Sequence, residues 1–132
     1  MKYWFVRSPY KTRKWEDVLM SGVFKLYGIR NYAAKKNISA MGKNDMALWY
    51  SSTAGKKIFG TMKIKETAYQ DMTSEGDWLA IDLIPMITFE KPVSYTQLKE
   101  YEILINSNII SQNRISVVEI TKEEYDEIMN NK

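Results

Sequence analysis

The segment LYGIRNYAAKKNISAM (Leu26–Met41) places three residues with ligand-binding potential at the start of a predicted helix. Gly28, Arg30 and Asn31 precede a run whose apolar residues recur at helical spacing. The first turn of a helix offers unpaired backbone N–H groups and the positive end of the helix dipole, which suit an anion or the polar edge of a ligand. Ordinary helices also begin this way, and Asn is a favoured N-cap, so both interpretations stay open for this segment alone.

The residue types of the chain exclude several kinds of chemistry. It contains no cysteine and no histidine. Disulfides, zinc sites built on these residues, and Ser–His–Asp or Cys–His nucleophiles are therefore excluded. Neither an Asp-x-Asp cluster nor a glycine-rich phosphate loop occurs, so we expect no metal and no cofactor.

Basic and acidic residues are unevenly distributed along the chain. Residues 1–65 hold 14 Lys/Arg and three Asp/Glu, whereas residues 66–132 hold five Lys/Arg and 13 Asp/Glu. Surface built by the first half would attract a polyanion such as DNA or RNA. The opposite interpretation is that the two halves interleave in one compact domain and neutralise each other.

Length and hydrophobic content predict one domain over residues 1–132. The chain is 45% hydrophobic and has 17 aromatic residues, enough for a single packed core. No apolar run reaches the length of about 18 residues that a membrane-spanning helix needs, and no signal-peptide pattern opens the chain. We therefore expect a soluble, cytoplasmic protein that acts as a monomer.

Hydrophobic periodicity predicts an α+β domain. Strands are expected at residues 3–7, 46–51, 58–64, 78–90 and 115–120. Helices are expected at residues 14–22, 31–41, 94–101 and 121–129. A polar loop of twelve residues, 66–77, separates two of the strands and is long enough to predict a functional role. Large aromatic residues dominate small cores, so Trp4, Trp15, Trp49 and Trp78 are assigned to the core.

Eight blocks of sequence carry a resemblance to a known family: YWFVRSP, KWEDVLMSG, GIRNYAAKKNISAM, DMALWYSS, IFGTMKIKETAYQD, DWLAIDLIP, KPVSYTQLKE and SQNRISVVEITKEEYDEI. In this order they resemble the EVE domain, of the thymocyte nuclear protein type, within the PUA-like superfamily. The resemblance implies a PUA-like fold, a small mixed β-barrel of about five to six strands surrounded by short helices.

The chain departs from the family pattern at two informative places. Leu26 and Ser51 stand where the family has a tryptophan and a histidine. These replacements remove a stacking ring and a hydrogen-bond partner from the implied pocket. Tyr27 is the nearest replacement ring, although we do not assign it to the site at this stage.

The resemblance implies a module that reads a modified nucleobase in DNA or RNA. The base would be methylated or hydroxymethylated cytosine, or N6-methyladenine, flipped into a pocket. The positions that match the family supply the expected base pocket: Arg7, Ser8, Gly28, Arg30, Asn31, Tyr50, Ser52, Arg114 and Ser116. The lysines expected to contact the nucleic-acid backbone, or else to form a solvated face, are Lys35, Lys36, Lys56 and Lys57.

Several roles within this set have two interpretations. Asn31 either reads a base edge through its amide or only caps the helix, and Gly28 either lets a ligand approach the backbone or only serves a turn. Tyr50 would stack on the base or form a hydrogen bond with it. Arg7, Arg30 and Arg114 would hold phosphate, although Arg114 could instead pair with a carboxylate.

Two other functions remain open. A general RNA-binding PUA-like domain without preference for a modification would use the basic surface alone. A small hydrolase acting on modified nucleosides, as some PUA-like relatives are, would need a Lys–Glu or Lys–Tyr pair in its cleft. The helix start shows no carboxylate, so we expect no enzyme, and any cleavage would come from a separate effector protein.

Overall fold

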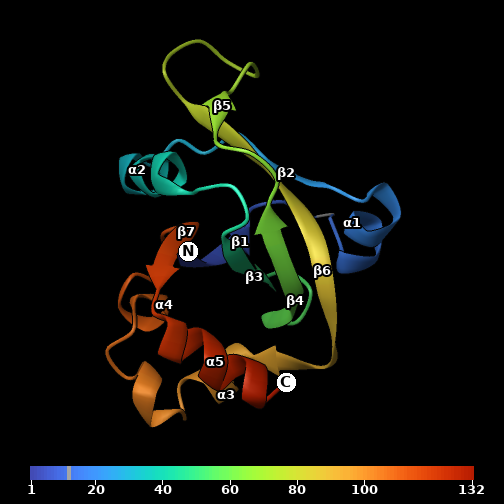
Figure 1. The fold of residues 1–132 in the computed structure, drawn as a ribbon, viewed down its shortest axis with the longest axis vertical. Coiled ribbons are helices and arrows are strands. Elements are labelled where there is room, and N and C mark those ends of the chain that lie inside the picture. Colours follow the sequence, from blue (N-terminus) through green and yellow to red (C-terminus); the bar gives the residue numbers. More distant parts are fainter. Residues whose placement is uncertain (12) are drawn as a thin grey trace.

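A computed structural model of the chain describes residues 1–11 and 13–132 (Figure 1). The strands are β1 (Tyr3–Ser8), β2 (Phe24–Leu26), β3 (Met46–Ser51), β4 (Lys57–Ile64), β5 (Tyr69–Gln70), β6 (Leu79–Ser94) and β7 (Val117–Ile120). The helices are α1 (Trp15–Ser21), α2 (Tyr32–Ala40), α3 (Tyr95–Leu98), the 3-10 helix η1 (Glu102–Leu104), α4 (Asn108–Ser111) and α5 (Lys122–Asn130). No helix within these two ranges has both the length and the apolar character needed to cross a bilayer.

The strands form one curled, mixed sheet in the order β2-β6-β4-β3-β1-β7, and β5 pairs with β6 beside it. Only β1 and β3 run parallel among these pairs, since α1, β2 and α2 carry the chain back between them. The remaining pairs are antiparallel. The α+β class and the small, half-closed mixed barrel that the sequence predicts are therefore confirmed.

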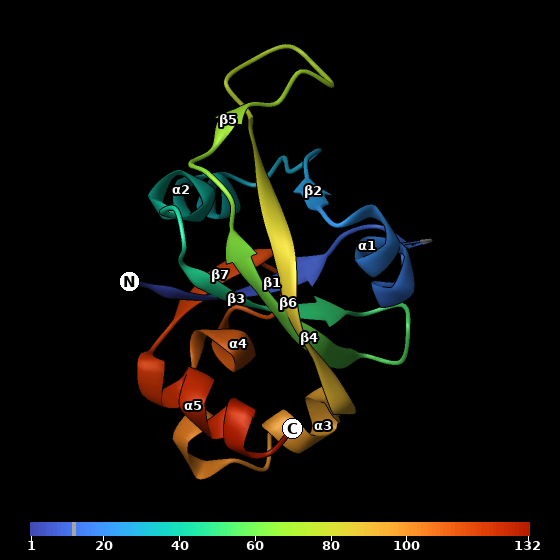
Figure 2. The ribbon, with the colours of Figure 1, turned by 45° about the vertical axis from the view of Figure 1, so that its right-hand side comes forward.

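The central strands bury side chains on both faces of the sheet. Trp4 and Val6 of β1 belong to a core cluster covered by α1 and α2. Phe5, between them in the sequence, belongs to a second cluster with the C-terminal helices. Figure 2 shows α3, α4 and α5 below the sheet, with α1 and α2 on the other side. Two covered faces explain why β1 and β3 read as almost continuous apolar runs.

Three of the four tryptophans lie in the core, as predicted. The exposed fractions of Trp4, Trp15 and Trp49 are 1%, 4% and 0%. The prediction for Trp78 is wrong, because this residue precedes β6 and its half-buried ring packs on the exposed side chain of Tyr32. Aromatic character alone could not reveal that the sheet begins one residue later, at Leu79.

Capping residues in the sequence predict most helix ends correctly. The predicted strand boundaries are less accurate, because they depend on pairing with distant strands. Asn31 is the N-cap of α2. The helix predicted at residues 31–41 is α2, which ends at Ala40, because its C-cap Met41 already has an extended conformation. The strand expected at 78–90 continues to Ser94, and the short strand β2 has no sequence signal of its own.

At Gly60, the backbone of β4 lies close to both β6 and the side chain of Trp15 in α1. A Cβ atom there would overlap the backbone oxygen of Ile87 and would lie 2.5 Å from Cζ2 of Trp15. We expect Gly60→Ala to lower the free energy of unfolding by about 2 kcal/mol, and the melting temperature by about 8 °C. Gly42→Ala is the matched control, since its Cβ would lie 3.6 Å from Asp45 in ordinary contact. Equal melting temperatures for the two variants would contradict this account of the packing.

Candidate nucleic-acid interface

The residues predicted to form one base pocket are divided between two places. Arg7, Tyr50, Ser52 and Arg114 line a cavity of about 390 Å³, here called the basic pocket. Its complete lining is Arg7, Tyr50, Ser52, Lys56, Tyr95, Asn113 and Arg114. Gly28 and Arg30 lie elsewhere, beside the loop that follows β5. A single pocket containing all the predicted residues is therefore not present in this conformation.

The basic pocket lies where β1 and β3 end. These strands are parallel and in register, with Arg7 opposite Tyr50, so their C-terminal ends meet at one edge. Tyr50 is 4% exposed and faces the second core cluster, while Trp49 faces the first. Trp49 is therefore in the core, as predicted, and Tyr50, predicted as a pocket residue, is buried as well because helices cover both faces of β3.

Arg7, near the end of β1, forms hydrogen bonds with the segment that precedes β7. Its guanidinium donates hydrogen bonds to the carbonyl oxygens of Ile109 (2.6 Å) and Ile115 (2.9 Å) and lies 4.8 Å from the ring of Phe5. Burial lowers the pKa of the Arg7 guanidinium, and the hydroxyl of Tyr95 partly opposes that shift. Arg7 therefore has a structural role in addition to the positive charge that it brings to the pocket.

Positive charge dominates the basic pocket. Arg7, Lys56 and Arg114 line it, and no acidic residue does. Within residues 1–11 and 13–132, none of these three cations forms an ion pair with a carboxylate, so the ion-pair interpretation of Arg114 finds no support there. A cavity with three cations, two tyrosines and small polar side chains suits a phosphate group of a nucleic-acid backbone.

Outside the basic pocket, structural contacts also engage three other predicted residues, Ser8, Asn31 and Ser116. The hydroxyl of Ser8, on the opposite face from Arg7, accepts a hydrogen bond from the N–H of Tyr10 at 3.4 Å. The carbonyl of Ser116 accepts one from the N–H of Arg7 at 2.7 Å. Oδ1 of Asn31 accepts a hydrogen bond from the N–H of Ala34 at 2.9 Å, which is the capping interaction. The NH2 group of the same side chain takes no part in the cap.

A second cavity, of about 260 Å³, lies between the end of β2 and the segment around β5. We call it the tyrosine pocket, and it is lined by Lys25, Tyr27, Tyr69, Asp71, Met72, Thr73 and Ala80. Tyr27 and Tyr69 are 39% and 44% exposed, so both rings are accessible to a ligand. Two accessible tyrosine rings and a methionine make this pocket more apolar than the basic pocket.

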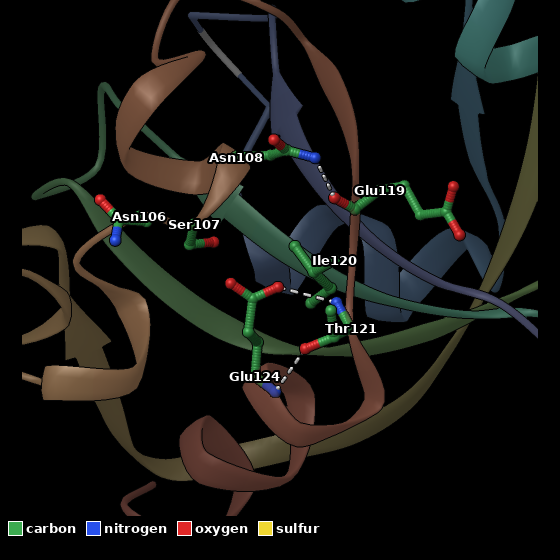
Figure 3. Close-up of a pocket in the computed structure, with 7 residues that line it drawn as sticks. All are labelled: Asn106, Ser107, Asn108, Glu119, Ile120, Thr121 and Glu124. Carbon is green, nitrogen blue, oxygen red and sulfur yellow. Dashed lines mark hydrogen bonds between the residues drawn. The ribbon is translucent and has the colours of Figure 1, made fainter.

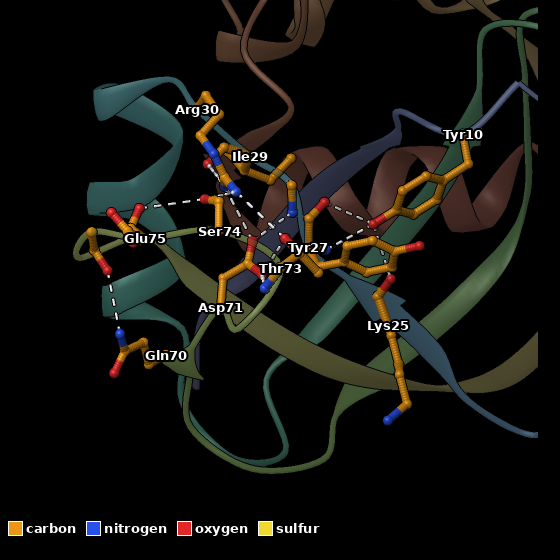
Figure 4. A network of polar contacts seen from close by, with 12 residues as sticks. Tyr10, Lys25, Tyr27, Ile29, Arg30, Gln70, Asp71, Thr73, Ser74 and Glu75 are labelled. Atoms are coloured by element: carbon orange, nitrogen blue, oxygen red, sulfur yellow. Dashed lines mark hydrogen bonds and ion pairs between the residues drawn. The ribbon is translucent and has the colours of Figure 1, made fainter.

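Hydrogen bonds fix the two tyrosines of this pocket. The hydroxyl of Tyr10 accepts from the N–H of Tyr27 at 2.7 Å and donates to its carbonyl at 2.8 Å, and the two rings lie 5.1 Å apart (Figure 4). The hydroxyl of Tyr69 donates to Oδ1 of Asp82 at 2.6 Å. Burial, followed by this bond to Asp82, raises the pKa of Tyr69 to about 12, so its hydroxyl is neutral at physiological pH.

Asp71 connects the tyrosine pocket to the start of α2. Its side chain is 1% exposed, and Oδ2 accepts the N–H of Gly28 at 2.7 Å and Nη1 of Arg30 at 3.1 Å (Figure 4). Oδ1 accepts the N–H and the hydroxyl of Thr73 at 2.9 and 2.6 Å. Gly28 has φ of 75°, a left-handed conformation that favours glycine and turns its N–H toward this carboxylate.

Asp71 was not among the predicted site residues, and the prediction that the start of α2 has no carboxylate is wrong. A carboxylate does lie at the start of α2, although it comes from a residue 43 positions after Gly28. The length of the loop 66–77 was the available signal, and Tyr27 is the replacement ring that the sequence offered but that we did not assign. Neither signal indicated which side chain of the loop turns inward.

The four predicted backbone-contacting lysines have different surroundings. Lys56 lines the basic pocket. Nζ of Lys35 lies 5.6 Å from the ring of Trp78. Lys36 and Lys57 are exposed, on α2 and at the start of β4. These positions agree with a solvated face and leave the contact with nucleic acid as a proposal.

A third cavity, of about 320 Å³, lies against the start of α5 (Figure 3). Its polar groups are engaged in local contacts, since Glu124 accepts the N–H of Thr121 at 2.7 Å and the amide of Asn108 donates to the carbonyl of Glu119 at 2.9 Å. Two glutamates and no basic residue line it. Its charge is therefore unsuited to a polyanion.

A profile of the EVE domain matches residues 2–131. The chain belongs to the EVE domain family. Thymocyte nuclear protein 1 of Mus musculus is 29% identical, over 77% of this chain and 56% of that protein, so the chain spans about half the length of its curated relative. The predicted EVE resemblance is confirmed.

Solved structures share the fold over almost the whole chain. Protein Atu2648 from Agrobacterium tumefaciens superposes with a TM-score of 0.91 at 27% identity, covering 97% of this chain and 90% of that one. Human THYN1 protein, in complex with DNA containing 5-methylcytosine, gives 0.87 at 24% identity, covering 98% and 96%. At this identity, the human structure is evidence for the fold alone.

The buried carboxylate of Asp71 makes a specific prediction about acid stability. Burial raises its pKa, but the bonds from Thr73, Gly28 and Arg30 outweigh that effect and hold the pKa well below the ordinary value. A lowered pKa stabilises the fold above the pKa of an unfolded aspartate, about 3.9, and this contribution is lost as the pH falls below that value. We expect Asp71→Asn to lower the free energy of unfolding by about 2 kcal/mol at pH 7. Between pH 7 and pH 3, the variant should lose less stability than the wild type. Urea denaturation at the two pH values measures both effects.

Asp126→Asn is the matched control for that experiment. Asp126 pairs with Lys122 on exposed α5, where such a pair contributes little, so its stability should stay within about 0.5 kcal/mol of the wild type. An Asp71→Asn variant that loses as much stability as the wild type between pH 7 and pH 3 would show that Asp71 is not the group responsible.

Proposed function

We propose that this EVE domain binds DNA or RNA carrying a modified base, with the base in the tyrosine pocket and a backbone phosphate in the basic pocket. The observation that carries the proposal is the presence of an accessible aromatic cavity and a separate cationic cavity in one EVE domain. The human relative crystallised with DNA containing 5-methylcytosine supports this class of ligand.

The tyrosine pocket has suitable chemistry for a flipped base. Taking a base out of its stack costs a few kcal/mol, and stacking on an aromatic side chain returns about 1–3 kcal/mol. Tyr27 and Tyr69 are the accessible rings, and Met72 adds apolar surface. Burial of one methyl group contributes about 0.8 kcal/mol, so preference for a methylated over an unmodified base should be about fourfold from this term.

A short segment of chain connects a residue of the basic pocket to a residue beside the tyrosine pocket. Arg7 lines the basic pocket, and Tyr10, which holds Tyr27, follows it by three residues. Three residues span at most about 11 Å. This short connection supports a shared ligand with separate positions for phosphate and base.

The first test measures fluorescence-titrated binding of single-stranded 12-mers, as DNA and as RNA. Each carries one central 5-methylcytosine, 5-hydroxymethylcytosine or N6-methyladenine, or no modification. We expect the wild type to prefer one mark, and Tyr27→Ala to weaken binding to that oligonucleotide about tenfold by removing a stacking ring. Tyr27→Phe keeps the ring and should retain the preference.

Asn31→Ser resolves the two roles of Asn31 in the same assay. Serine keeps an oxygen that can cap α2 but lacks the amide that would read a base edge. Unchanged preference in Asn31→Ser would assign Asn31 to the cap alone. A wild type that binds all 12-mers equally would overturn the modified-base proposal and favour a general RNA-binding domain.

The basic pocket predicts a salt effect that does not depend on the modification. Arg114→Gln should weaken binding to all oligonucleotides similarly and reduce the slope of log K against log salt by about one unit, because one phosphate contact is lost. Lys122→Gln, on α5 and paired with Asp126, is the control and should leave the slope unchanged. An unchanged slope in Arg114→Gln would remove this residue from the interface.

A hydrolase is the second candidate, favoured by Lys25 lining the same pocket as Tyr27 and Tyr69. We propose binding without catalysis instead, because Asp71 already accepts four hydrogen bonds and its lowered pKa is far from that of an effective general acid or base. Release of base from free modified nucleosides, followed by chromatography, would overturn this choice if Lys25→Met abolished it.

We propose a monomer in the cytoplasm, with any cleavage of the bound nucleic acid supplied by a separate effector protein. Light scattering after size exclusion, with and without a bound 12-mer, tests the oligomeric state.

A further inference from the structure

Tyr32 and Trp78 form an aromatic pair outside both core clusters. Tyr32 is the first residue of α2 and is 76% exposed, while Trp78 ends the loop that precedes β6. Their ring centroids lie 5.0 Å apart with 34° between the planes. Such an exposed tyrosine buries too little surface to contribute much to stability, so its position calls for another explanation.

Two cations flank the same pair. The guanidinium carbon of Arg30 lies 5.4 Å from the ring of Trp78, and Nζ of Lys35 lies 5.6 Å from it. We call Arg30, Tyr32, Lys35 and Trp78 the aromatic platform. Exposed rings next to positive charges are the combination with which proteins bind single-stranded nucleic acids, because bases stack on the rings while cations attract the backbone.

The aromatic platform adjoins the tyrosine pocket. The carbonyl of Trp78 accepts the N–H of Asp71 at 2.8 Å, and Asp71 lines that pocket. Arg30 joins the two features, since its Nη1 contacts Asp71 while its guanidinium lies near Trp78. A nucleotide next to one held in the tyrosine pocket is therefore well placed to reach the platform.

We propose that the aromatic platform stacks an unpaired base adjacent to the modified one, so that the ligand is single-stranded or locally unpaired. This inference rests on the proposed function for the position of the modified base. The occupant is a nucleobase, rather than an apolar protein surface, because two cations border the rings and both would lose hydration in an apolar interface.

The experiment uses the full chain and fluorescein-labelled single-stranded DNA 12-mers with one central 5-methylcytosine. One version has thymine on each side of the mark, and two others have an abasic site on the 5′ or the 3′ side. We expect Tyr32→Ala to weaken binding to the intact 12-mer about tenfold, with the salt slope unchanged because no charge is removed. Tyr32→Phe keeps the ring and should bind like the wild type.

Coupling between the tyrosine and the flanking base identifies the stacking partner. One of the two abasic 12-mers should bind the wild type about tenfold more weakly, yet Tyr32→Ala should weaken that oligonucleotide no further. Met20→Ala, at an 88% exposed position on α1, is the control and should change nothing. Melting temperatures of all variants establish that the fold is retained.

Trp78 offers a second measurement that does not need the Tyr32 variant. Trp78 is the half-buried tryptophan, whereas Trp4, Trp15 and Trp49 are buried, so base stacking should quench its fluorescence on binding. Quenching that disappears in Trp78→Phe supports the platform.

The outcomes separate the two proposals. Unchanged affinity in Tyr32→Ala, or an equal loss on intact and abasic 12-mers, overturns the platform. If Tyr27→Ala still removes the preference for the mark in that case, the modified-base proposal stands. A wild type that binds none of the DNA and RNA 12-mers of the two experiments overturns both.

Discussion

The carboxylate of Asp71 lies buried between two segments that are far apart in the sequence. It accepts the N–H of Gly28 and the guanidinium of Arg30 on one side and two donors of Thr73 on the other. Without the Asp71 carboxylate, donors at the start of α2 and in the loop after β5 would lose their partner. Each buried polar group left unpaired in this way would lower the stability of the fold by about 1–3 kcal/mol. The tyrosine pocket and the aromatic platform share that loop, so both depend on the same buried charge.

A second constraint is the burial of the sheet on both faces. Because successive side chains of a strand point to opposite faces, Arg7 and Ser8 are separated although they are neighbours in the sequence. Arg7 reaches the face covered by the C-terminal helices and joins Arg114 there, whereas Ser8 lies on the face of α1 and α2. The residues predicted to share one pocket are therefore separated, and only some of them line the basic pocket.

This division suits the physics of reading a marked base. Phosphate contacts contribute affinity without information about sequence, whereas the fit around a base contributes the preference. A methyl group adds only about 0.8 kcal/mol, so discrimination needs a pocket whose rings are already fixed. Tyr10 bonds the backbone of Tyr27 and packs on its ring, and Asp82 accepts the hydroxyl of Tyr69. The acidic cavity at α5 lies outside this arrangement.

The sequence by itself determined the features that depend on neighbours within one turn or one strand. The α+β class, the helix start at Asn31 and the burial of Trp4, Trp15 and Trp49 are of this kind, because their signals are periodicity and local hydrogen bonding. The EVE family followed from the resemblance of eight sequence blocks in order. Only the tertiary structure decided that Asp71 accepts a hydrogen bond from Gly28 and that Trp78 packs on Tyr32 outside the core. It also decided that Arg7 and Gly28 lie in different places. Those relations depend on how distant segments pack, which residue spacing does not encode.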